Sequence, residues 1–115
     1  MKKQWDIYTT GDEAAAPRGT GRPQGVAFLV ISSDAVNATF SHVTVLPLVG
    51  AGEERDVYPN EARNEDTVVL GHQIRTIRHR ELTVRKGRIG DPLVRSAIMQ
   101  ALSVQLGMRL EPEIE

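Results

Sequence analysis

The hydrophobic positions along most of the chain follow the short, often alternating pattern of β-strands. Apolar or alternating runs bounded by turn-forming residues predict strands over Gln4–Thr9, Val26–Ser32, His42–Leu48, Arg55–Tyr58, Thr67–Ile77 and Leu82–Ile89. Within the longest of these runs, Gly71 predicts a β-bulge or a close backbone approach. Between the runs, Ser33–Asn37 has the cap residues of a short helical turn, and Val49–Glu54 has the glycines of a turn.

The last element has a helical period instead. Asp91 and Pro92 form an N-cap followed by proline at the first helical position, and Gly107 suits the C-terminal stop. Between them one apolar face is predicted from Leu93, Val94, Ala97, Ile98, Ala101, Leu102 and Leu106. The pattern as a whole predicts a mainly β (α+β) fold, in which the C-terminal α-helix packs on a small, strongly bent, barrel-like sheet.

Length and composition narrow the class of protein. The chain has 115 residues and no internal repeat, which predicts one domain over residues 1–110 and a short acidic tail over 111–115. It has no cysteine, which excludes disulfides and thiolate chemistry. The sequence shows no secretion-signal pattern and no apolar run of membrane-spanning length, so we expect a cytoplasmic protein without membrane contact.

The net charge is only −1, but the charges are unevenly distributed. Residues 75–88 carry one acid, Glu81, against Arg75, Arg78, Arg80, Arg85, Lys86 and Arg88, while residues 53–66 are mainly acidic. A basic segment of this kind could contact phosphate groups. The simpler interpretation is a solvated strand pair with ordinary surface charge, and the charge pattern alone favours it.

Arg22 lies at the junction of a glycine-containing loop and a strand. Gly19 and Gly21 precede it, Pro23 follows it, and Arg18 lies in the same loop. A guanidinium held at such a junction can grip a phosphate in two places. A structural salt bridge explains the residue equally well, and the sequence leaves both readings open.

The histidines do not form a metal site. His42, His72 and His79 lack the spacing of paired ligands, and the sequence predicts neither a metal nor another cofactor. In the stretch LGHQIRTIR, His72 could act as a general acid or base near neutral pH, although a lone histidine in a strand is more often a satisfied polar residue. Arg75 could bind phosphate or pair with the acidic segment.

Several stretches, in order along nearly the whole chain, resemble the MazF/PemK family of toxin endoribonucleases. RPQGVAFLVISSDAVN is similar to the RPxxV segment of the family, and VTVLPL looks like its third strand. VVLGHQIRTIRHRELTVRKGRI is similar to its long strand and the strand that follows, and DPLVRSAIMQALSVQLGM to its C-terminal helix. The opening WDIY fits its first strand, where a Gly-Asp-Ile/Val start is usual.

The resemblance implies an SH3-like (CcdB/PemK) barrel of about five to seven strands with a C-terminal helix, forming a homodimer. Family members are intracellular toxins that cut single-stranded RNA without a metal, through attack by the ribose 2′-hydroxyl. A cognate antitoxin with an acidic, flexible segment occupies the same groove as the RNA. By the same resemblance, we expect Arg22 and His72 to be catalytic, and Arg18, Gln73, Arg75 and Thr76 to bind RNA.

The sequence departs from the family pattern at four positions. Val49 stands where the family has Thr or Ser at the end of the third strand, and His72 replaces the acid before glutamine. The usual glutamate before the Arg-Pro pair falls on Pro17, although Glu13 lies further back in the loop. Leu70 stands where PemK-type members carry an arginine. Because valine can neither donate a hydrogen bond nor carry a proton, catalysis here is either rearranged around His72 or lost.

Two alternatives to the ribonuclease therefore stay open. The CcdB branch uses a similar barrel to poison DNA gyrase, through the C-terminal end of its helix, and cuts no RNA. A catalytically degenerate toxin would survive as a partner-binding module. The Arg-Pro junction and the Gln-x-Arg-Thr stretch resemble the ribonuclease branch more closely.

Overall fold

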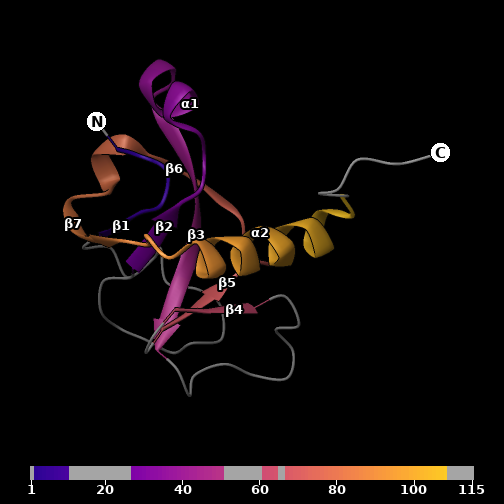
Figure 1. Ribbon diagram of the computed structural model, residues 1–115. Coiled ribbons are helices and arrows are strands. Elements are labelled where there is room, and N and C mark those ends of the chain that lie inside the picture. The colour runs from indigo at the N-terminus through magenta and orange to yellow at the C-terminus, as the bar shows by residue number, and fades with distance from the viewer. Residues whose placement is uncertain (1, 11–26, 51–60, 65–66, 109–115) are drawn as a thin grey trace.

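The computed structural model describes residues 2–10, 27–50, 61–64 and 67–108. In these residues an antiparallel sheet of seven strands is accompanied by two α-helices and one 3₁₀ helix (Figure 1). The strands are β1 (Asp6–Thr9), β2 (Ala27–Val30), β3 (His42–Gly50), β4 (Glu61–Asn64), β5 (Thr67–Leu70), β6 (Arg75–Arg78) and β7 (Val84–Arg88). The helices are α1 (Asp34–Thr39), η2 (His79–Glu81) and α2 (Pro92–Leu106). The expected mainly β class with a C-terminal helix is confirmed.

β3 is the central strand of the sheet. Its sheet neighbours give the order β4-β5-β3-β2-β1-β7, and β6 pairs separately with the first half of β3. In Figure 1, β3 runs from α1 at one end of the molecule to the β4–β5 pair at the other. β3 also continues two residues beyond the predicted strand, so Val49 and Gly50 pair with β5 and do not begin a turn.

The predicted long strand over Thr67–Ile77 is wrong, because the chain breaks it into β5 and β6. Leu48 pairs with Val69 of β5, whereas Val45 pairs with Arg75 of β6. The interruption therefore lies next to Pro47 of β3. Proline has no N–H to donate to a neighbouring strand, so the ladder cannot continue there. Gly71 lies in a turn and not in a strand bulge.

The other sequence predictions have mixed outcomes. The helical turn expected at Ser33–Asn37 is confirmed as α1, with the Ser33 hydroxyl accepting a hydrogen bond from the Val36 N–H. β4 had no counterpart among the predicted strands. The predicted edge strand over Arg55–Tyr58 lies outside the described residues.

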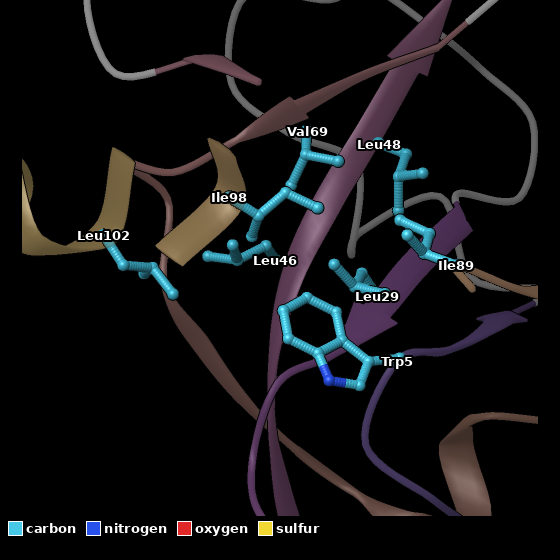
Figure 2. Packing of buried hydrophobic residues seen from close by; sticks show 8 residues of the cluster. All are labelled: Trp5, Leu29, Leu46, Leu48, Val69, Ile89, Ile98 and Leu102. Atoms are coloured by element: carbon cyan, nitrogen blue, oxygen red, sulfur yellow. The ribbon is translucent and has the colours of Figure 1, made fainter. Parts of the chain in front are cut away.

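Two apolar clusters lie on opposite faces of the central strands, because successive residues of a strand point to opposite sides. One cluster joins the sheet to α2 and contains Trp5, Leu29, Leu46, Leu48, Val69, Ile89, Ile98 and Leu102 (Figure 2). The other lies on the far face and contains Phe28, Val30, Val43, Val45, Ile77 and Leu82. On β3 and β6, alternate residues therefore lie on the α2 face or on the far face, which assigns each polar side chain of these strands to one of the two clusters.

α2 has the predicted ends. The Asp91 carboxylate accepts a hydrogen bond of 2.9 Å from the Leu93 N–H, and Gly107 adopts a φ of 68° at the C-cap. The predicted apolar face is only partly buried, because Ile98 and Leu102 contact the sheet while Leu93 is 80% exposed. In Figure 1 the C-terminal part of α2 extends beyond the strands, which leaves its apolar residues without a sheet to cover. No helix in the described segments has the length and apolar character needed to cross a membrane.

Candidate active site

The turn between β5 and β6 carries the two polar residues at the centre of the candidate site, His72 and Gln73. A hydrogen bond of 3.2 Å from the Gln73 N–H to the Leu70 carbonyl closes the turn. His72 and Gln73 are both half-buried. The turn therefore holds both side chains at a fixed place beside the centre of β3.

His72 favours its neutral form. Burial lowers the pKa of the imidazole below its ordinary value of 6.5, because desolvation disfavours the charged ring. His72 Nε2 lies 3.3 Å from Gln73 Nε2. Which of the two groups donates this hydrogen bond depends on the tautomer of the ring. A neutral histidine at physiological pH suits the role of a proton acceptor more than that of a donor.

The Gln73 side chain has one unmet hydrogen bond among the described residues. Its Oε1 is buried, and no donor from the described part of the chain reaches it. Buried polar atoms are usually paired, and leaving one unpaired costs about 1–3 kcal/mol. A donor from a ligand would therefore lower the free energy of this turn.

Arg75 and Thr76 do not converge on one point. They are consecutive residues of β6, so their side chains leave opposite faces of the strand. Arg75 shares its face with the buried Ile77 and is half-buried, whereas Thr76 is exposed. The side chains of His72 and Gln73 therefore contact each other, whereas those of Arg75 and Thr76 leave opposite faces of β6.

Val49 is a buried core residue. It is 2% exposed and packs with Val68 and Leu70 of β5. Its side chain has no polar atom and no access to a ligand. The position of the family's threonine or serine is thus part of the apolar interior in this chain, and it supplies nothing to the chemistry.

Arg18 and Arg22 lie outside the described residues, as do Glu13 and Pro17. Their predicted roles stay predictions. The residues that flank this segment are described: Thr9 pairs with Ala27, and Ala27 pairs with Leu48. The described flanks therefore lie side by side on β1 and β2, and Ala27 is next to the second half of β3.

One group of polar residues was not anticipated as a site. Ser41, His42, Arg78, His79 and Arg80 line a hollow of about 440 Å³ at the start of β3. The sequence showed the arginines only as part of a basic run and the histidines only as isolated residues. The signal that joins them is the pairing of β3 with β6, which the sequence did not reveal.

None of the described residues forms a group of three histidine, aspartate or glutamate side chains arranged to hold a metal ion. The candidate site consists of imidazole, amide and guanidinium groups on β6 and the turn before it. These groups can accept a proton, donate hydrogen bonds and offset negative charge, which are the requirements of phosphoryl chemistry.

The fold is that of toxin endoribonucleases of known structure. An endoribonuclease from a mycobacterial species, solved in complex with its cognate antitoxin, is 19% identical, with a TM-score of 0.75 over 96% of this chain and 100% of that chain. A second mycobacterial endoribonuclease structure is 21% identical, with a TM-score of 0.73 over 96% and 95%. The MazE–MazF complex from Deinococcus radiodurans is 18% identical, with a TM-score of 0.70 over 94% and 97%.

The sequence itself assigns the family. The model of the PemK-like, MazF-like toxins of type II toxin–antitoxin systems matches residues 3–106. The chain belongs to this family, as its motifs predicted. A comparison with curated proteins gives no match.

Proposed function

We propose that this toxin cleaves single-stranded RNA without a metal ion. A ribose 2′-oxygen attacks the adjacent phosphorus, the P–O5′ bond breaks, and the products are a 2′,3′-cyclic phosphate and a 5′-hydroxyl. His72 accepts the proton of the attacking 2′-hydroxyl, and the leaving 5′-oxygen takes up a proton from water. The observation that carries the proposal is the place of His72, held in the hydrogen-bonded β5–β6 turn at the position where the resemblance puts an acid, and its lowered pKa favours a neutral proton acceptor there.

The remaining predicted residues bind the RNA and its reacting phosphate. Arg22 offsets the charge that develops on the phosphorane, a task for which guanidinium is suited by charge and geometry. Arg18, Gln73, Arg75 and Thr76 hold the strand, with Arg75 acting from the face of β6 opposite to that of Thr76. Val49 has no hydroxyl and is buried, so it cannot take part in proton transfer. This supports His72 as the proton acceptor.

The partners follow from the same family. The chain acts as a homodimer in the cytoplasm, and a cognate antitoxin inhibits it with an acidic, flexible segment. Support for the antitoxin partner comes from solved relatives that are complexes of a toxin with its antitoxin.

The test uses purified, antitoxin-free protein and a long defined RNA in the presence of EDTA. The wild type is expected to give discrete fragments with 2′,3′-cyclic phosphate ends. His72→Ala removes the proton acceptor, so we expect cleavage to fall by about 10²–10⁴-fold. Added imidazole is expected to restore part of the rate, which a purely structural role of His72 would not allow. Arg22→Ala is expected to abolish cleavage while the protein stays folded.

The outcomes separate the steps. Loss of wild-type cleavage in EDTA, with recovery on adding a divalent ion, contradicts the metal-free mechanism. Equal cleavage by wild type and His72→Ala moves proton transfer to another group. Cleavage by a folded Arg22→Ala protein removes Arg22 from the mechanism.

A second candidate function is binding to DNA gyrase in the manner of the CcdB branch. It is favoured by the exposed apolar residues at the C-terminal end of α2, where Val104 is 58%, Leu106 55% and Met108 58% exposed. Inhibition of gyrase supercoiling by a protein that leaves RNA intact would support it, and Leu106→Lys should then relieve the inhibition.

A further inference from the structure

The hollow at the start of β3 is built from two segments that are far apart in the sequence. His42 and Arg78 are direct partners in the β3–β6 ladder, and the His79 N–H donates a 3.0 Å hydrogen bond to the Ser41 carbonyl. The Ser41 hydroxyl lies 3.0 Å from His42 Nδ1. Backbone pairing therefore fixes the positions from which the lining side chains of the hollow project.

The charge of the basic segment divides into two parts. Arg85 and Arg88 of β7 form ion pairs with the buried Asp6, at 3.4 and 3.2 Å. In the described part of the chain no carboxylate forms an ion pair with Arg78 or Arg80, both of which are exposed. The hollow thus holds two guanidinium groups of the basic segment that form no ion pair with a carboxylate of the described residues.

The hollow continues a polar strip on the sheet. Leu46 and Leu48 lie on the face of β3 that α2 covers, and by alternation His42 and Thr44 share that face. On β6, Thr76 lies opposite Thr44 and Arg78 opposite His42. This face is therefore apolar beneath α2 and carries hydroxyl, imidazole and guanidinium groups further along, ending at the hollow.

We propose that this hollow binds backbone phosphates of the single-stranded RNA, at a site separate from the cleavage site. The inference rests on the proposed function for its ligand. Two guanidinium groups and a hydroxyl match a phosphodiester in charge and hydrogen-bonding capacity. Phe40, next to Ser41, is 61% exposed, and an exposed aromatic ring beside cationic groups is typical of single-strand binding.

The position of the hollow makes it an extension of the binding track. The turn that carries His72 lies between the levels of Val45 and Leu48, three to six residues from His42 along β3, which corresponds to about 10–20 Å of extended strand. Thr76, one of the predicted RNA-binding residues, lies on the strip between the turn that carries His72 and the hollow. An RNA strand held at its reacting phosphate by the candidate active site can follow the strip and place a further part of its backbone on Arg78 and Arg80.

The test measures binding without cleavage. A fluorescent 2′-O-methyl RNA of roughly 12 nucleotides cannot supply the attacking hydroxyl and falls within the usual range of single-strand site sizes. We expect the double variant Arg78→Gln, Arg80→Gln to bind this probe about tenfold more weakly than the wild type. Its plot of log affinity against log salt should be shallower by about 1.4, because two phosphate contacts are lost.

Two controls test whether the expected loss of RNA binding comes from the arginines in the hollow or from the loss of any positive charge on the protein. Lys86→Gln removes one exposed positive charge on β7, outside the hollow, and should leave both affinity and salt slope near the wild-type values. The double variant Arg78→Lys, Arg80→Lys keeps the charge, so it should keep the salt slope while losing part of the affinity. Thermal melts should match for all variants, since the substituted side chains are exposed.

The results distinguish this inference from the proposed function. If the wild type cuts RNA but the Gln double variant binds the probe with unchanged affinity and slope, the hollow is not an RNA site and the proposed function stands. If the wild type binds but does not cut, and the variant loses binding, the hollow stands and the ribonuclease proposal fails. If poly-glutamate binding, and not probe binding, depends on Arg78 and Arg80, the hollow binds an acidic protein segment and the inference is overturned. A wild type that neither cuts nor binds RNA overturns both.

Discussion

At the scale of single residues, Trp5 has an uncommon backbone conformation. Its φ is 77°, in the left-handed region where glycine is at ease and other residues are strained by about 1–3 kcal/mol. The resemblance places the glycine of the family's Gly-Asp-Ile/Val start at this position, just before β1. Here the indole is 9% exposed, packs with Leu29, Ile89 and Ile98, and lies 5.2 Å from the Arg95 guanidinium. Burial of the side chain thus offsets a strained backbone.

Because of this strain, we expect the glycine variant of Trp5 to be more stable than the alanine variant, the reverse of the usual order. Trp5→Ala keeps the left-handed strain and loses the packing, whereas Trp5→Gly loses the same packing and removes the strain. Urea unfolding is therefore expected to show Trp5→Gly more stable than Trp5→Ala by about 1 kcal/mol. At an unstrained position the order is reversed, with glycine less stable by about 0.5–1 kcal/mol. Finding Ala the more stable variant would mean that the segment relaxes out of the left-handed conformation.

His72 predicts a dependence of stability on pH. Its pKa in the folded protein lies below 6.5 because of burial, while in the unfolded chain it is about 6.5. Below that value the unfolded state binds a proton that the folded state binds less well, so the free energy of unfolding falls as the pH drops through the interval between the two pKa values. Above about 6.5 both states are neutral and His72 adds no slope. His72→Gln should therefore lose less stability than the wild type between about pH 7 and 5, and equal losses would contradict the assignment.

At the scale of elements, α2 is defined by its caps. The Asp91 carboxylate satisfies one of the N–H groups that a helix leaves unpaired at its start. Asp91→Ala is expected to lower the free energy of unfolding by about 1 kcal/mol, measured by urea titration. Asp91→Asn is the matched control, since it keeps a side-chain acceptor and should retain most of the stability. A large loss in the Asn variant would assign the effect to charge and not to the cap.

The break between β5 and β6 places the residues of the candidate active site in a turn. The apolar and alternating pattern from Thr67 to Ile77 favoured one continuous strand, but the neighbouring residue Pro47 cannot take part in a full ladder. The chain turns there, and the turn carries His72 and Gln73. The candidate proton acceptor is therefore held in a turn that hydrogen bonding and strand pairing fix at both ends.

At the scale of the whole molecule, α2 and the sheet share one core. Ile98 is fully buried between them, whereas its neighbour Met99 is 37% exposed on the same helix. Ile98→Ala is expected to cost about 2–5 kcal/mol, a large share of the 5–15 kcal/mol typical of a domain. Met99→Ala should change the stability by less than about 0.5 kcal/mol. Similar effects of the two variants in urea unfolding would show that α2 does not pack on the sheet through Ile98.

The sequence by itself determined the features that neighbouring residues encode. The cap at Asp91, the stop at Gly107 and the helical turn after Ser33 follow from local backbone geometry and hydrogen bonding, and all three are present. The family was evident in motifs that are contiguous in the chain, and it is confirmed. Of the candidate site, the sequence picked out His72 by residue type and Gln73 through the resemblance to the family, and the two side chains contact each other in one turn.

Only the tertiary structure decided the features that depend on residues far apart in the chain. Burial made Val49 a core residue and shifted the pKa of His72, and both effects arise from the strands packed around them. Strand register brought His42 to Arg78 and formed the hollow. The extent of the sheet left Val104 and Leu106 exposed at the C-terminal end of α2, and Leu93 is exposed although its spacing matched the buried face of the helix. Register and burial are set by pairings between distant segments, and a linear pattern of hydrophobic and polar positions does not specify which segments meet.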